Sequence, residues 1–256
     1  MKILLFFVLF FVGANLWTPA VGQEQHRLME VELGSHHYLS SVSGRVIAAK
    51  KFDVANRDDG TRSFTNSWVM SLSGETASGT RAVRVDGSGS IVSVDHRYVL
   101  TKESERTTFE KNWKRADGTL QVVETKTNSD GSVEQLQQQI EMFPNEVVDQ
   151  DLFRSIVPFV TKQESQFVLV DIDDVVQFVS WMIGPCRAMK IHVGGKAVLC
   201  RCLEINYDEV NSQRFYYRDD NVIRIVDLRN RVSTDLVTHQ IYDAALLTLA
   251  SKSQDP

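Results

Sequence analysis

The chain has 256 residues, 43% of them hydrophobic, and a formal net charge of −5 at pH 7. This length allows one large domain or two small ones with a substantial core, so folding does not depend on disulfides. The acidic balance argues against a nucleic-acid partner, whose phosphates would require a basic surface.

The N-terminus predicts an export signal. Lys2 is followed by ten consecutive apolar residues, 3–12. This run is too short for a membrane-spanning helix, which needs about twenty residues, and it is typical of the apolar core of a signal peptide. Small residues at Ala20 and Gly22 predict cleavage between Gly22 and Gln23. We expect a mature chain of residues 23–256, secreted or periplasmic, with no membrane span after cleavage.

Turn sequences recur between β-rich segments. They are Asp59-Gly60, Asp86-Gly87, Asp117-Gly118, Asp130-Gly131, Gly194-Gly195 and Asp219-Asp220-Asn221. Asp-Gly and Gly-Gly reach the positive φ angles of tight hairpins at little cost. Sequential hairpins predict a mainly β (α+β) fold with a curved antiparallel meander sheet.

Helical signals are few. Residues 175–183 carry apolar side chains at helical spacing, after the Asp-rich segment 171–174 and before Gly184-Pro185, which would end a helix. We expect this segment to be the one main helix against which the sheet packs. A second, C-terminal helix is expected over residues 241–249.

The segment around residues 142–160 divides the chain by composition. Polar hairpins rich in Thr and Ser precede it, and more apolar strands follow it. We interpret residues 23–256 as one β-rich domain, or as two halves that are joined near residues 142–160 and share one curved sheet.

Three cysteines are present, Cys186, Cys200 and Cys202. An exported protein meets an oxidising environment, where one disulfide and one leftover thiol are expected. The predicted hairpin register selects the pair. A three-residue loop, 194–196, places Ile191 opposite Leu199, so that the apolar faces of both strands coincide.

In that register all three cysteines lie on the face opposite Ile191. Cys202 lies opposite Ala188, two residues from Cys186, and Cys200 lies farther along the strand. We therefore predict a disulfide between Cys186 and Cys202, with Cys200 as a free thiol. Three buried thiols remain the alternative.

Candidate catalytic and metal-binding residues are scarce. Cys200 and His192 would share a face of the hairpin, which allows a thiol- or hydrolase-type enzyme as an alternative. The sequence has no second Cys/His pair at zinc-finger spacing, no Gly-x-Ser-x-Gly and no dinucleotide fingerprint. We assign no catalytic residue, metal ligand or cofactor, and the sequence identifies no ligand-binding residue.

Strand–turn–strand segments over residues 83–94, 193–205 and 215–220 carry a loose resemblance to a protein class. They resemble exported bacterial β-rich proteins of unknown function, similar in outline to periplasmic lipoprotein carriers. The resemblance implies a curved sheet that wraps around helices and holds an acyl chain. It assigns no functional residue.

These observations lead to a first hypothesis of a secreted, non-enzymatic binding domain. Its ligand would be an apolar small molecule or lipid, or its partner an envelope protein, held on the concave side of the sheet. The thiol or hydrolase enzyme using Cys200 and His192 is the second hypothesis. A structural surface protein is the third.

Overall fold

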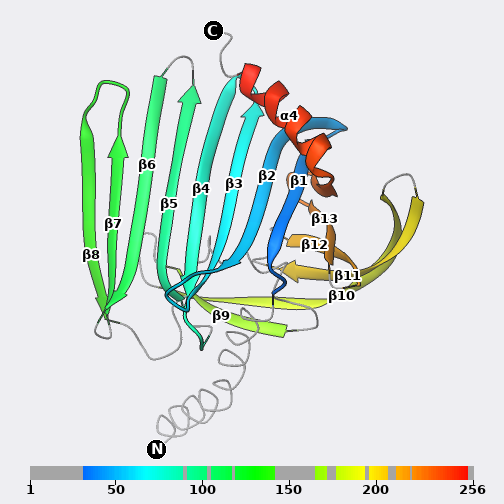
Figure 1. Ribbon diagram of the computed structural model, residues 1–256, viewed down its shortest axis with the longest axis horizontal. Helices are drawn as coiled ribbons and strands as arrows, with labels where there is room; N and C mark the ends of the chain where they lie inside the picture. The colour runs from blue at the N-terminus through cyan, green and yellow to red at the C-terminus, as the bar shows by residue number, and fades with distance from the viewer. Residues whose placement is uncertain are drawn as a thin grey trace, which may run out of the picture.

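The computed structural model describes residues 31–88, 91–102, 105–116, 119–141, 165–171, 177–193, 196–206, 212–219 and 221–252. Within these residues the chain forms a 14-stranded antiparallel sheet and helix α4 (His239–Lys252). Figure 1 shows how the helix lies against the sheet. The mainly β fold with a curved antiparallel sheet is therefore confirmed. The predicted export signal and the segment 142–160 lie outside the described residues.

The first part of the sheet is a meander in which each strand pairs with the next. Its strands are β1 (Gly34–Val42), β2 (Arg45–Asn56), β3 (Arg62–Leu72), β4 (Glu75–Val85), β5 (Ile91–Lys102), β6 (Glu105–Ala116), β7 (Thr119–Thr127) and β8 (Val133–Glu141). β8 forms one edge of the sheet.

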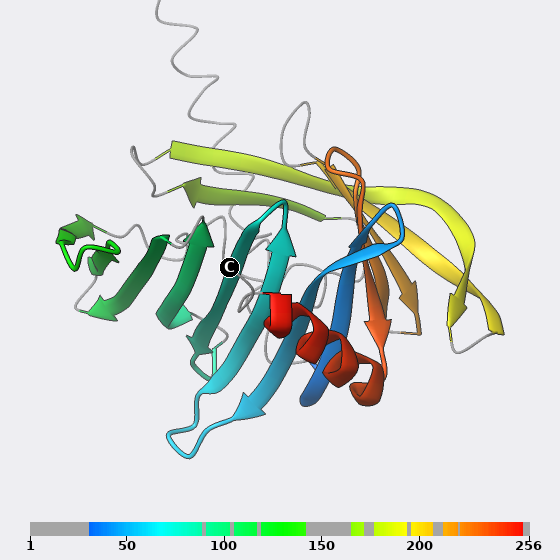
Figure 2. The ribbon, with the colours of Figure 1, turned by 90° about the horizontal axis from the view of Figure 1, so that it is seen from above.

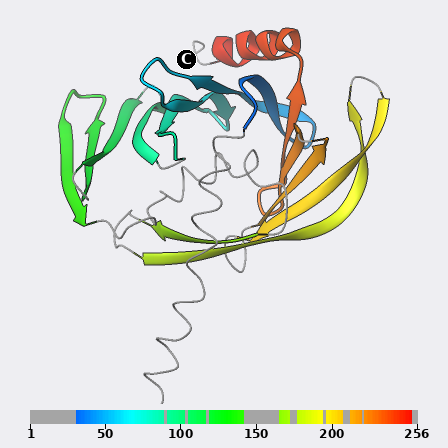
Figure 3. The same cartoon turned by 60° about the horizontal axis from the view of Figure 1, so that its bottom comes forward.

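The second part is another meander, and β9 forms the other edge of the sheet. Its strands are β9 (Ser165–Asp171), β10 (Gln177–Val193), β11 (Lys196–Asn206), β12 (Ser212–Arg218), β13 (Asn221–Asp227) and β14 (Val232–Val237). The meanders join where β1 pairs with β14. Figures 2 and 3 show that the sheet is strongly curved, with β9 and β10 crossing the concave side of the first meander.

Four of the predicted turns lie between paired strands. They are Asp59-Gly60 (β2–β3), Asp86-Gly87 (β4–β5), Asp130-Gly131 (β7–β8) and the turn at Asp219 (β12–β13). Gly60 and Gly131 have φ angles of 79° and 82°. Asp117-Gly118 and Gly194-Gly195 lie outside the described residues, although the strands that flank them pair as hairpins.

Two further hairpin turns were not singled out from the sequence. Ser43-Gly44 joins β1 to β2, and Ser73-Gly74 joins β3 to β4. Both residues of each turn have positive φ, from 50° to 83°. This is the geometry of two-residue turns that match the twist of the flanking strands.

Helix α4 packs on one face of β1, β2 and β3, which we call the outer face. Tyr242 and Leu249 of the helix are buried against Leu39 and Ala49 of the sheet. The C-terminal helix expected over residues 241–249 is thus confirmed, and it is the element on which the sheet packs.

The opposite, concave face is the inner face and carries the main core. A row of paired residues crosses it from β2 to β7, each at most 3% exposed: Val54, Phe64, Val83, Val94, Trp113 and Val122. The second meander adds Ile183, Leu203, Ile205 and Phe215, each at most 4% exposed. Burial of this apolar surface is the main favourable contribution to folding.

The main helix predicted for residues 175–183 is wrong for the part that the structure describes. Residues from Gln177 onward belong to β10, a strand of 17 residues. β10 pairs with β9 on one side and β11 on the other. Its β-branched and aromatic residues, such as Val179 and Trp181, suit a strand, and pairing on both sides outweighs their helix-like spacing.

Candidate binding groove

Two further rows of paired residues cross the inner face beside the apolar row. The aromatic row consists of Trp68, Gly79, Tyr98 and Phe109, on β3 to β6. The polar row consists of Asn66, Arg81, His96, Lys111 and Glu124, on β3 to β7. These side chains are partly buried, unlike those of the apolar row.

Gly79 allows the rings of the aromatic row to lie over β4. A Cβ atom at this position would lie 2.6 Å from Cζ2 of Trp68, 2.6 Å from Cβ of Tyr98 and 2.7 Å from the carbonyl oxygen of Arg97. A glycine inside a strand often marks such a close approach. Because residue 79 has no side chain, Trp68 and Tyr98 can approach each other across the intervening strand β4.

The rings form a continuous chain of contacts. The Trp68 and His96 centroids are 5.6 Å apart, those of His96 and Tyr98 are 5.1 Å apart, and those of Tyr98 and Phe109 are 4.6 Å apart. The last pair is stacked, with 13° between the ring planes. Such spacings are favourable for aromatic pairs. Together the rings make an apolar floor across β3 to β6.

A groove of about 520 Å³ opens over the β5–β8 end of this floor. Its walls include His96, Tyr98, Phe109, Lys111, Lys126 and Leu136. Cavities of roughly 300–1,000 Å³ commonly hold small ligands in proteins. The groove is thus large enough for part of an organic ligand.

Two lysine–glutamate ion pairs line the groove. Lys111 lies 2.9 Å from Glu124, and Lys126 lies 3.1 Å from Glu134. Hydrogen bonds from Asn128 and Lys126 lower the pKa of the exposed Glu134 carboxyl group. Because the ammonium groups of Lys111 and Lys126 are paired with glutamates, their aliphatic stems can lie beside the aromatic rings.

Lys50 extends the aromatic row at its other end. It is the Cα partner of Trp68 on one side and of Tyr38 on the other. Burial lowers the pKa of the Lys50 ammonium, and the Asp227 carboxylate raises it to a smaller extent. The Lys50 side chain is partly buried, so the cation keeps contact with solvent.

The predicted Cys186–Cys202 disulfide is present, with the Cα atoms 5.0 Å apart. The register that led to this prediction was wrong by one residue, because Ile191 lies opposite Val198 rather than Leu199. A bulge between Cys186 and Met189 then shifts the pairing and places Cys186 directly opposite Cys202.

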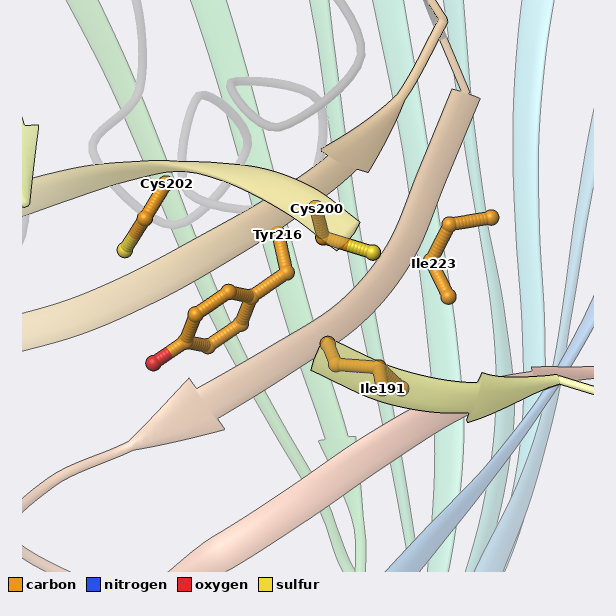
Figure 4. Close-up of a cluster of buried hydrophobic side chains, with 5 residues drawn as sticks. All are labelled: Ile191, Cys200, Cys202, Tyr216 and Ile223. Atoms are coloured by element: carbon orange, nitrogen blue, oxygen red, sulfur yellow. The ribbon is translucent and has the colours of Figure 1, made fainter. Parts of the chain in front are cut away.

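Cys200 is a buried free thiol, in a cluster with Ile191, Cys202, Tyr216 and Ile223 (Figure 4). The expectation that the cysteines lie on the face opposite Ile191 is therefore wrong for Cys200 and Cys202. Burial raises the pKa of the Cys200 thiol, although Arg218 and Arg224 lower it to a smaller extent. A raised pKa reduces the thiolate fraction that a nucleophile needs.

His192 does not lie beside Cys200. It is exposed and follows the buried Ile191 in β10, so its side chain is on the other face of the hairpin. The geometry therefore does not bring together the thiol and imidazole that the sequence suggested as a pair.

The described residues contain no group of three or more His, Cys, Asp or Glu side chains that could hold a metal ion. Over the same part of the chain, no helix has the length and apolar character that a membrane crossing requires.

No protein-family model matches the sequence, and no curated protein matches it. A solved structure that is similar is that of a beta-barrel-like protein of a domain of unknown function, DUF1849, from Brucella abortus. The match has 13% sequence identity and a TM-score of 0.44, and it covers 81% of this chain and 98% of that chain.

The groove residues were not identified from the sequence. The rings of the apolar floor beneath the groove come from three strands, β3, β5 and β6, and only the pairing of strands β3 to β6 brings them together. The one local signal is Gly79, an isolated glycine within a strand pattern, which indicates close approach of other groups to the backbone.

Proposed function

We propose that this protein is an exported binding protein that holds an elongated, mainly apolar ligand on the inner face of its sheet. The observation that carries the proposal is the aromatic row, because its partly buried rings lead into the groove between β5 and β8. Aromatic side chains offer large apolar contact areas, and ligand sites are typically lined by them together with a few polar groups.

Export is part of this proposal. The disulfide supports it, because such bonds persist mainly outside the cytoplasm. The N-terminal sequence, with Lys2 ahead of a short apolar run, supports it independently.

Binding can be tested with N-phenyl-1-naphthylamine, a neutral apolar dye whose fluorescence rises when it leaves water. The purified protein should bind the dye with saturation, and Gly79→Val should weaken binding at least tenfold by placing a side chain between Trp68 and Tyr98. Gly184→Val is the matched control, because Gly184 also lies in a strand and a Cβ there would meet no atom within 4 Å.

Both variants must first show the circular dichroism spectrum of the wild type. If Gly79→Val does not fold, Phe109→Ala removes one stacked ring without adding bulk and should weaken dye binding instead. Absence of saturable binding, or equal binding by wild type and the groove variants, would refute the proposed function.

A further inference from the structure

Lys50 is a cation whose position calls for an explanation. Among the described residues it forms no ion pair, and the only carboxylate that affects its pKa is that of Asp227. Asp227 in turn accepts hydrogen bonds from the backbone N–H and the side-chain amide of Asn230, at 2.8 and 3.1 Å. Even partial burial of a charge without a close counter-charge costs free energy, and such groups are often functional.

The neighbours of Lys50 are aromatic. Tyr38 is 4% exposed, and its hydroxyl group donates a hydrogen bond to the carbonyl oxygen of Val222 at 3.3 Å. Trp68 lies on the other side of Lys50 and begins the aromatic row. The Lys50 ammonium group therefore lies at the β2 end of the aromatic row.

We infer that Lys50 binds the carboxylate of a single-chain fatty acid, whose hydrocarbon chain follows the aromatic row towards the groove at β5–β8. This inference rests on the proposed function and names the class of ligand. The ammonium group of Lys50 supplies the opposite charge and up to three hydrogen bonds for the carboxylate.

The length and width of the path fit a single chain. Three strand spacings separate Trp68 from Phe109, which gives about 14 Å of aromatic surface. The row is one side chain wide on each strand. Lys111 and Lys126, farther along, already have glutamate partners, so they do not compete with Lys50 for the carboxylate.

The test compares three amphiphiles that share one chain and differ in head group: laurate, dodecanol and dodecyltrimethylammonium. Each amphiphile is titrated into the complex of purified protein and dye at neutral pH, and the loss of dye fluorescence gives the affinity of the amphiphile. Wild type should bind laurate about tenfold to a hundredfold more tightly than dodecanol, the range of a charge-assisted hydrogen bond. Dodecyltrimethylammonium should bind most weakly.

Lys50→Met should bind laurate and dodecanol with equal affinity, while its affinity for dodecanol stays close to that of wild type. Lys50→Arg, which keeps the charge, should retain the preference for laurate. Lys51→Met is the matched control, because Lys51 is the next residue of β2, lies on the outer face and pairs with Asp53 at 2.9 Å. It should retain the preference.

The possible failures can be told apart. If dodecanol binds but wild type shows no preference for laurate, or if Lys50→Met keeps that preference, the inference about Lys50 is wrong and the groove remains a binding site. If none of the three amphiphiles displaces the dye, the fatty-acid ligand is excluded. If the dye itself does not bind, the proposed function fails as well.

Discussion

The imidazole ring of His37 lies 4.8 Å from that of His239, centroid to centroid, where β1 meets the first turn of α4. His37 also contacts Tyr242, and its Nε2 atom is buried without a hydrogen-bond partner among the described residues. Burial lowers the pKa of His37, and electrostatic interactions with His239 and Lys51 lower it further, against smaller opposing effects of Asp53 and Asp243. The docked helix therefore favours a neutral His37.

Acidification should accordingly destabilise the protein. The unfolded state takes up a proton near the ordinary histidine pKa of 6.5, whereas folded His37 resists protonation until a lower pH. Stability should thus be lost as the pH falls below 6.5. Thermal unfolding followed by circular dichroism at several pH values measures this loss.

His37→Phe keeps a ring against Tyr242 and removes the titrating group, so it should reduce the dependence on pH. Some dependence should remain, because burial also lowers the pKa of His36. An identical pH profile in His37→Phe and wild type would contradict the assignment to His37.

Loss of the disulfide should lower stability. Cys186 and Cys202 are 16 positions apart in the sequence, and closing a loop of this size stabilises a fold by about 3 kcal/mol. The double variant Cys186→Ser/Cys202→Ser should unfold at a lower urea concentration than wild type. Reductant should shift wild type towards the double variant and leave the double variant unchanged, and insensitivity of wild type to reductant would show that the bond is absent.

Cys200 should react slowly with thiol reagents in the folded protein. Its side chain is fully buried and its thiol pKa is raised, so little thiolate is accessible. Iodoacetamide labelling followed by mass spectrometry should find Cys200 unmodified in native protein and modified after unfolding in urea. Rapid labelling of the native protein would instead favour the thiol-enzyme hypothesis.

If the proposed export signal is cleaved as expected, the mature protein has a defined N-terminus. When the full chain is expressed in a bacterium with a periplasm, the protein recovered from that compartment should begin at Gln23. N-terminal sequencing gives the answer directly. Recovery of a cytoplasmic chain that begins at Met1 would exclude export in that host.

Local features of the fold were predictable from sequence. The Asp-Gly turns at residues 59–60 and 130–131 were predictable because their signal lies within the turn. In each, the aspartate side chain accepts a hydrogen bond from the backbone N–H two residues later, Thr61 or Ser132. The C-terminal helix was predictable for a similar reason, because its apolar spacing is a property of one segment.

Features that depend on distant strands were not predictable. Residues from Gln177 onward have helix-like apolar spacing, and only pairing with both β9 and β11 makes them a strand. The bulge after Cys186 changes the register by one residue, and nothing in the local sequence requires it. Leu199 was expected in the core with Ile191, but it is 66% exposed. The aromatic row likewise exists only once β3 to β6 are paired.

The pairing of β1 with β14 has a consequence for folding. The buried hydroxyl groups of Ser40 and Thr234 lie 2.8 Å apart, although the two residues are 194 positions apart in the sequence. Closing so long a loop costs conformational entropy. Folding is generally slow in proteins whose contacts join residues distant in the sequence. Each meander can form from its own hairpins, but the pairing of β1 with β14 cannot form until β14, the last strand, is in place. A chain that stops before β14 would leave β1 and β13 as open strand edges prone to aggregation.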